Sequence, residues 1–224
     1  MTFSIVGHCP DTGMFGLAIS SSSPAVAARC AYARAGVGAV CSQNVTDPRL
    51  GPRTLDLIQQ GATPTEALSI VERTGSHMAW RQVLAVDGSG ESAIFSGPNV
   101  LGRWSEAKNR NVAAAGNLLA DTGVPQAMID TFHTSSGHLG DRLVGALVAG
   151  LKAGGEAGPV HSAGLLVVDK QSWPLAELRI DWTTDCPIRG LVEAWMVYRP
   201  QMDAYVTRAL DPRSAPSYGV PGDE

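Results

Sequence analysis

Apolar residues recur along the chain in short runs that are separated by residues favouring turns. The first two runs, residues 2–6 and 15–19, are joined by Pro10-Asp11-Thr12-Gly13, which supplies the backbone angles of a tight turn. An Asp-Gly-Ser-Gly sequence at residues 87–90 is a second strong hairpin signal. Together these patterns predict strands at residues 2–6, 15–19, 36–41, 82–86, 91–95, 111–115, 161–168 and 176–181.

Other stretches carry their apolar residues at helical spacing. Thr63 followed by Pro64 puts a capping residue before a proline at the first helical position, which marks the start of a helix. Gly61 and the pair Gly154-Gly155 mark helix ends. The expected helices cover residues 54–58, 63–71, 125–132, 139–152 and 188–210.

The order of these elements indicates the fold class. Strands, helices, strands, helices, strands and a final helix follow one another, with hairpin-like joins throughout. Antiparallel sheets packed face to face between helical layers accommodate this order, and a parallel winding does not. The sequence therefore predicts an α+β protein. Because no internal repeat or interior linker divides it, residues 1–210 are expected to form one domain, and the Pro/Gly-rich residues 211–224 a loose C-terminal tail.

Composition narrows the range of partners. Hydrophobic residues make up 44% of the 224 residues and charged residues 17%, with a formal net charge of −4. This balance gives no electrostatic signal for nucleic acid or an anionic membrane, so a small-molecule substrate or a protein partner is favoured. No apolar run reaches the roughly 18 residues of a transmembrane helix, and the first residues lack the basic segment of a signal peptide. We therefore expect a cytoplasmic protein.

Nothing in the sequence indicates a metal or a cofactor. The four cysteines, Cys9, Cys30, Cys41 and Cys186, lack CxxC spacing, and the five histidines lack the spacing of a metal-binding motif. Gly36-Val37-Gly38 has neither the third glycine nor the following helix of a phosphate-binding loop. The expectation is a site that uses no metal and no cofactor.

The start of the chain carries the sharpest chemical signal. Met1 is followed by the small residue Thr2, which opens the first predicted strand. Removal of Met1 would leave Thr2 with a free α-amine, whose pKa of about 7.7 to 8.0 allows it to take the proton of the neighbouring hydroxyl near neutral pH. Thr2 would then combine a nucleophile and a base in one residue. On this feature alone, an ordinary β-branched strand residue is the favoured explanation of Thr2.

Several stretches together resemble the motifs of one family: residues 2–6, residues 33–43, the Gly51-Pro52-Arg53 turn, Arg81-Gln82 and residues 115–119. They look like a bacterial domain family of unknown function within the N-terminal nucleophile (Ntn) hydrolases, and the resemblance runs from residue 2 to about residue 185. It implies a four-layer αββα sandwich of two antiparallel sheets flanked by helices, in which the first strand presents the processed N-terminal residue.

The same resemblance implies a reaction. An Ntn-type amidohydrolase would cleave a small amide, peptide-like or ureido substrate through an acyl-enzyme, with Thr2 as the nucleophile and its own α-amine as the base. The identity of the substrate is not something that the resemblance supplies.

One position departs from this family. Many relatives carry a basic residue directly after the serine that matches Ser21, and this chain has Ser22 there. A cation near the nucleophile depresses its proton affinity and can hold a substrate carboxylate. That role passes to Arg29 or Arg34 or is absent, and Ser22 is expected to lie at the substrate-binding position.

Polar residues at the predicted strand ends complete the candidate site. Ser21 is expected to orient the α-amine, and Asn117 to donate a hydrogen bond to the developing oxyanion. Gln43, Asn44 and His161 are candidates for contacts with the substrate. Each of these residues has a plainer interpretation as a polar residue in a turn or at a strand end.

Two other functions stay open. A non-catalytic protein that binds a small molecule or a partner would keep the scaffold without using Thr2, and the state of the N-terminus distinguishes it from a hydrolase. A cysteine nucleophile, Cys9 or Cys41, is a third alternative, although no histidine is convincingly placed to activate it.

The final predicted helix carries a dense group of apolar residues: Leu191, Val192, Trp195, Met196 and Tyr198. This is more apolar surface than a covering helix needs on one face, so we expect a homodimer contact there. Packing into the core is the alternative.

Overall fold

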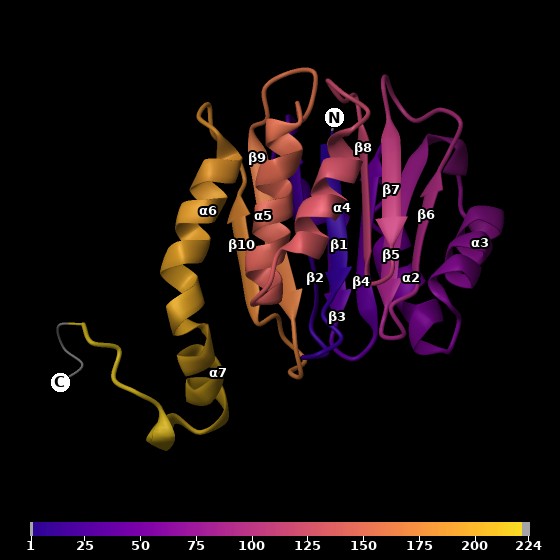
Figure 1. Ribbon diagram of the computed structural model, residues 1–224. Helices are drawn as coiled ribbons and strands as arrows, with labels where there is room; N and C mark the ends of the chain where they lie inside the picture. Colours follow the sequence, from indigo (N-terminus) through magenta and orange to yellow (C-terminus); the bar gives the residue numbers. More distant parts are fainter. Residues whose placement is uncertain (1, 221–224) are drawn as a thin grey trace.

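The structure, a computed structural model, describes residues 2–220. Its larger sheet consists of β1 (Thr2–His8), β2 (Phe15–Ser21), β7 (Ser105–Asn109), β8 (Val112–Asn117), β9 (Ser162–Val168) and β10 (Ala176–Ile180). These six strands are antiparallel and lie in the order β10-β9-β2-β1-β8-β7 (Figure 1). The first strand of the chain therefore lies inside the sheet, between β2 and β8.

A second antiparallel sheet packs against the first. It contains β3 (Ala31–Arg34), β4 (Gly38–Asn44), β5 (Arg81–Asp87) and β6 (Ser92–Ser96), in that spatial order. Buried side chains such as Leu17, Ile19 and Leu84 fill the space between the two sheets. This inner core comes from the alternating apolar residues on the facing sides of both sheets.

Helices cover the two outer faces (Figure 1). The six-stranded sheet is covered by α4 (Val124–Thr134), α5 (Leu139–Lys152) and α6 (Pro187–Tyr198), and the four-stranded sheet by α2 (Leu50–Gln59) and α3 (Pro64–Thr74). Phe3, Met128 and Leu143 belong to the first outer core, and Leu55 and Val83 to the second. The α+β class and the four-layer αββα arrangement of two antiparallel sheets flanked by helices are thus confirmed.

The start of α3 agrees with its capping signal. Thr63 Oγ1 accepts a hydrogen bond from Glu66 N at 3.2 Å, and the Glu66 carboxylate accepts one from Thr63 N at 2.9 Å. This reciprocal pair satisfies two backbone donors that would otherwise have no partner inside the helix.

Some short elements were not predicted. They are α1 (Val26–Cys30), β3, β7 and the 3-10 turns η1 (Met78–Trp80), η2 (Arg199–Gln201) and η3 (Pro212–Ser214). The edge strand β7 lacks an apolar run and exposes Glu106 and Lys108, so no alternation marks it. Charged residues on an edge strand hinder pairing with another sheet.

The prediction of one uninterrupted final helix over residues 188–210 was wrong. Helix α6 ends at Tyr198, η2 follows, and α7 (Met202–Leu210) begins after it. Pro200 lies inside η2, and a proline removes a backbone donor and clashes with the preceding helical turn. Of the predicted tail, residues 211–220 are described and contain η3, and residues 221–224 lie outside the described residues. Across residues 2–220, no helix combines the length and the apolar character needed to cross a membrane.

Candidate functional site

The alternation of side chains along β1 places Thr2 at one end of the space between the two sheets. Phe3 and Ile5 pack toward the covering helices, whereas Val6 and the hydroxyl of Ser4 face the second sheet. Since successive side chains of a strand point to opposite faces, Thr2 faces the same way as Ser4. The N-terminal end of β1, beside the label N in Figure 1, therefore lies at one edge of the space between the two sheets.

The neighbouring strands bring Ser21 and Asn117 to Thr2. Antiparallel register pairs Thr2 with Asn117 on β8 and Phe3 with Ser20 on β2. The hydroxyl of Thr2 donates to Ser21 Oγ over 3.4 Å. Thr2 is 5% exposed, and Ser21 and Asn117 are fully buried. The structure thus brings together the three residues that the sequence suggested as catalytic.

A buried hydrogen-bond network lies beside this end of the inner layer. Gln43 Nε2 donates to Gln82 Oε1 at 2.8 Å and to a backbone carbonyl of β8 at 3.2 Å. Gln43 Oε1 accepts from Ser4 Oγ at 2.6 Å. Gln82 accepts a further bond from Asn117 Nδ2 at 3.2 Å and donates to Ser96 Oγ at 3.0 Å. This network joins both sheets and fixes the strand ends around Thr2 relative to each other.

Replacing Gln82 by leucine is expected to lower the free energy of unfolding by about 3 kcal/mol, because the amides of Gln43 and Asn117 would each lose a buried acceptor. Urea denaturation measures this change. Gln126→Leu on the exposed surface of α4 is the control, with an expected change within about 0.5 kcal/mol. Equal stability of the two variants would contradict a structural role for the network.

Asn117 keeps one polar atom uncommitted. Its Oδ1 is buried and has no hydrogen-bond partner among the described residues. The oxygen and nitrogen of an asparagine amide exchange places when the side-chain amide turns by half a rotation. Asn117, which is paired with Thr2 in the register, therefore has one buried amide atom without a partner among the described residues.

Glu156 enters the site from the loop between α5 and β9. A bridge pairs it with Leu119, two residues beyond Asn117. Its two carboxylate oxygens accept from the backbone N–H of Ser22 at 3.0 and 3.2 Å. Glu156 is only 5% exposed. A buried carboxylate therefore lies beside the residue that follows Ser21.

The surroundings of Glu156 change its acidity. Burial raises the pKa of its carboxyl from 4.5 to about 7, because the charged form loses hydration. The positive charge of the amino terminus, the hydrogen bond from Ser22 and the nearby His161 act in the opposite direction. Glu156 thus changes its charge near neutral pH.

Two further candidates, Ser22 and His161, belong to the same neighbourhood. Ser22 donates its backbone N–H to Glu156, and a side-chain hydrogen bond from Ser22 also favours the charged carboxylate. His161 Nδ1 donates to the carbonyl oxygen of Thr183 at 2.8 Å, and its ring stacks on Trp182 with 4.5 Å between centroids. These contacts fix the orientation of the imidazole beside Glu156.

The remaining candidates have other contacts. Arg29 donates to the backbone carbonyls of residues 24 and 25, next to the Ser22 turn. Arg34 pairs with Asp56 at 2.9 Å and lies at the end of β3 that is paired with Gly38, away from Thr2. Asn44 donates to the carbonyl of Trp80 at 2.6 Å. Gln43 lies inside the buried network, so the structure does not place these side chains together in one binding surface.

The cysteine alternative meets an electrostatic obstacle at Cys41. This residue is fully buried, and burial raises the pKa of its thiol well above the ordinary value of 9.0. Its Sγ donates to Gln43 Oε1 at 3.5 Å. A thiol in this state supplies little of the thiolate that a nucleophile needs. Cys9 is also buried, at the opposite end of β1 from Thr2.

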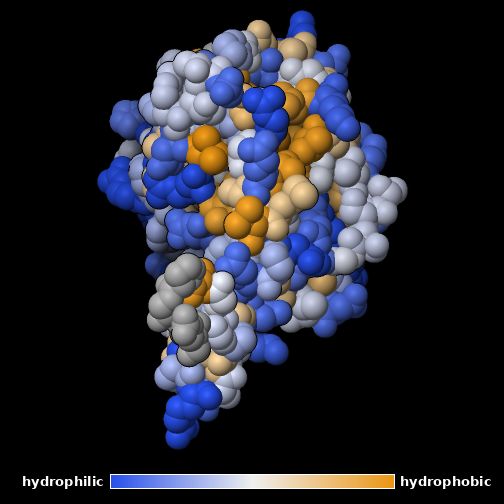
Figure 2. Space-filling view, turned by 90° about the vertical axis from the view of Figure 1, so that its left-hand side faces the viewer, coloured by the Kyte–Doolittle hydropathy of each residue, from blue (hydrophilic) through white to orange (hydrophobic). Residues whose placement is uncertain are grey.

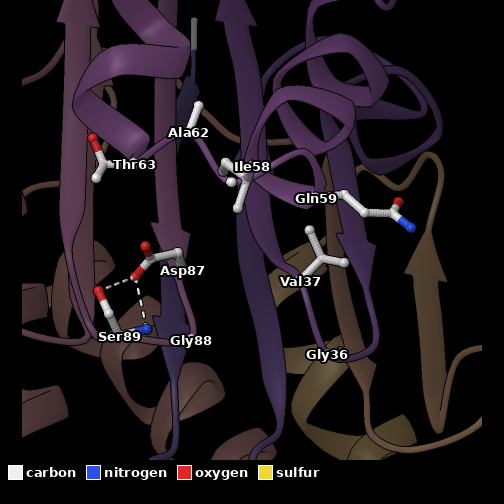
Figure 3. Close-up of a pocket in the computed structure, with 10 residues that line it drawn as sticks. Gly36, Val37, Ile58, Gln59, Ala62, Thr63, Asp87, Gly88 and Ser89 are labelled. Carbon is white, nitrogen blue, oxygen red and sulfur yellow. Dashed lines mark hydrogen bonds between the residues drawn. The ribbon is translucent and has the colours of Figure 1, made fainter.

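A cavity of about 300 Å³ opens beside Glu156, with Val160 and Asp185 also in its wall. A different cavity, of about 360 Å³, lies where β5 turns into β6, at the end of the four-stranded sheet that is opposite to Gln43 and Gln82 (Figure 3). Figure 3 shows Asp87 and Ser89 at its edge, and Asp87 Oδ1 accepts from Ser89 N and Oγ at 2.9 and 2.8 Å. Because that carboxylate is committed to its own turn, the cavity near Glu156 is the better candidate for a ligand.

The described residues contain no group of three His, Cys, Asp or Glu side chains that could hold a metal ion.

The final helical segment divides its apolar residues between core and surface. Leu191 and Trp195 are buried against the six-stranded sheet, whereas Met196 and Val197 are 70% and 66% exposed. Figure 2 shows the side of the molecule on which α6 lies, with apolar residues in the middle of that face and polar ones around them.

The homodimer stays a prediction. Light scattering is expected to give twice the monomer mass, and Met196→Glu to restore the monomer; a monomeric wild type would contradict it.

Sequence reasoning missed Glu156 and Gln82 as members of this region. Glu156 follows the helix-ending Gly154-Gly155 in a loop, and its approach to Ser22 depends on packing of distant segments. Gln82 occupies a buried strand position, where a polar residue among apolar neighbours was the available signal.

Fold and site together define a four-layer αββα protein in which a hydroxyl-bearing residue opens a central strand beside a buried carboxylate. A family model described as a family of unknown function, DUF1028, matches residues 2–191. The chain belongs to this family.

A solved structure of the same family agrees with this assignment. The crystal structure of protein SPO2555 from Silicibacter pomeroyi, of the same family, is 30% identical, covers 88% of each chain and superimposes with a TM-score of 0.82. Anbu (ancestral beta-subunit) from Yersinia bercovieri is 13% identical over 91% of this chain and 97% of its own, with a TM-score of 0.41, which carries no argument. No curated protein matches the chain. The family model and the SPO2555 structure therefore establish the family of the chain, and membership of the Ntn hydrolases stays a prediction.

Proposed function

We propose that this protein is an Ntn-type amidohydrolase that cleaves a small amide, peptide-like or ureido substrate after removal of Met1. The observation that carries the proposal is the position of Thr2: a hydroxyl residue opens a central strand at one end of the inner layer, next to Ser21 and Asn117. A free α-amine at this residue would complete a nucleophile and base without any other side chain.

The proposed reaction has two steps. The α-amine of Thr2 takes the hydroxyl proton while Oγ1 attacks the carbonyl carbon of the substrate. The C–N bond then breaks, the leaving nitrogen receives that proton, and the acyl group remains as an ester on Oγ1. Water attacks this ester and gives a proton to the amine, which returns it to Oγ1 as the acid product leaves.

Asn117 is proposed to stabilise the tetrahedral intermediates. For this, the Asn117 amide would turn by half a rotation when substrate binds, so that Nδ2 leaves Gln82 Oε1 and occupies the buried position that now has no partner among the described residues. A donor aimed at the developing oxyanion typically contributes about 3 kcal/mol to the transition state. Ser21, whose Oγ is in contact with the Thr2 hydroxyl, is proposed to orient the reacting group.

A second candidate function is supported by burial. Thr2 is 5% exposed, which leaves little room for a substrate at its hydroxyl, and the nearby cavity of about 300 Å³ has Glu156 in its wall. A non-catalytic protein that binds a small molecule in this cavity would have the same features.

The two functions are separated by one experiment. Intact mass of the protein expressed in its own host gives the state of the N-terminus, and a panel of amides is then assayed with the same sample. Loss of Met1 together with turnover that depends on Thr2 supports the hydrolase. Retention of Met1 in the mature protein contradicts it. The proposal includes a cytoplasmic location, with which the four free cysteines agree.

A further inference from the structure

We propose that Glu156 is a positioning residue that accepts a hydrogen bond from the α-amine of Thr2. This inference rests on the processed terminus of the proposed function. Two independent lines of contact lead from Glu156 to Thr2. On one side, Glu156 bridges Leu119, two residues beyond the Asn117 that is paired with Thr2. On the other, Glu156 accepts from the N–H of Ser22, which follows the Ser21 in contact with the Thr2 hydroxyl.

The hydrogen bonds of Glu156 leave it able to accept more. A carboxylate offers about four acceptor positions, and Ser22 supplies a backbone N–H, which both oxygens share, and a side-chain hydrogen bond. The side chain is only 5% exposed, although it lies in the wall of the cavity of about 300 Å³, so little of it is in contact with bulk water. An ammonium or amine group has the donors that such a carboxylate requires.

The charges around Glu156 point to the same partner. Among the influences that favour its ionised form, the positive charge of the amino terminus, which belongs to Met1 in the unprocessed chain, is the largest, ahead of the Ser22 hydrogen bonds and His161. Removal of Met1 would transfer this charge to the α-amine of Thr2. Asp185 and Cys186 share the adjacent cavity with Glu156. Arg29 donates to backbone carbonyls instead.

The proposed hydrogen bond between Glu156 and the α-amine of Thr2 would affect how this amine acts as a base. A carboxylate acceptor orients the amine so that its lone pair can face Oγ1. It also stabilises the ammonium form, so the amine becomes a free base only at a higher pH than it would without the charge. Glu156 gains and loses no atom in the reaction.

The test is a titration of the Thr2 α-amine by NMR in protein that carries 13C-labelled threonine and has lost Met1. Thr2→Ser removes the Thr2 signal and so assigns it. In Glu156→Gln, the pKa of the amine is expected to fall by about one unit, since the stabilising charge is lost. Glu156→Asp, which keeps the charge, is expected to restore most of the wild-type value. Glu72→Gln, at an exposed position of α3, is the matched control and leaves the amine unchanged.

A second measurement needs no variant. In the wild-type protein, Thr2 Cα and Glu156 Cδ are expected to show the same two titration steps, because interacting groups titrate as a pair. Two unrelated single steps would overturn the contact, as would an unchanged amine pKa in a folded Glu156→Gln protein.

The pH profile separates this inference from the proposed function. If the enzyme is active, Glu156→Gln moves the acidic limb of kcat/KM to lower pH, which a merely structural role would not do. An active enzyme with an unmoved limb overturns the role of Glu156 alone. A protein that hydrolyses none of the amides but shows the coupled titration keeps the contact and overturns the hydrolase.

Discussion

Thr2→Ala is expected to lower the rate of amide hydrolysis by about four to six orders of magnitude, because it removes the oxygen atom that attacks the amide carbonyl in the proposed mechanism. The substitution keeps a small residue after Met1 and a free α-amine, and it removes the hydroxyl together with the methyl group of Thr2. Turnover of the amide panel and intact mass are measured on the same preparation. Unchanged turnover in Thr2→Ala would exclude the hydrolase mechanism.

Two variants serve as controls for this prediction. Thr2→Ser keeps both the hydroxyl and the amine and is expected to retain activity. A lysine inserted between Met1 and Thr2 makes Thr2 internal and blocks its amine, so activity is expected to fall as in Thr2→Ala. Full activity of the blocked protein would show that the base is some other group.

Glu156→Gln is expected to change how the free energy of unfolding depends on pH. The unfolded chain loses the glutamate proton near 4.5 and the folded protein only near 7, so the folded state binds more protons in between. The stability that Glu156 contributes in its protonated form is therefore present below pH 4.5 and is lost as the pH rises through about 7. The shift corresponds to about 3 kcal/mol at about 1.4 kcal/mol per pKa unit.

Urea denaturation across the pH range measures this effect. At pH 8 the glutamine variant is expected to be more stable than the wild type by up to about 3 kcal/mol, and near pH 4.5 the two are expected to be alike. Glu72→Gln on the surface of α3 is the matched control, with the same pH dependence as the wild type. A wild-type slope that persists in Glu156→Gln would mean that another group causes it.

Local patterns were enough to predict most of the architecture. Alternation marked β1 and β2, helical spacing marked α4 and α5, and Thr63 with Pro64 marked the start of α3. These signals depend on residues a few positions apart, so they can be interpreted without knowledge of the fold. They fail where local order is weak, as in the polar edge strand β7, or where a single residue interrupts a pattern, as Pro200 does between α6 and α7.

The candidate site was likewise predicted from the sequence only where the signal is local. The sequence by itself determined that a small hydroxyl residue opens the first strand, and that Ser21 and Asn117 lie at strand ends. Only the tertiary structure decided that these ends meet, because antiparallel register is set by pairing between segments far apart in the chain. It also directed Gln43 into the buried network and folded the loop with Glu156 back onto Ser22. Such contacts arise from packing across layers, which no local spacing of residues encodes.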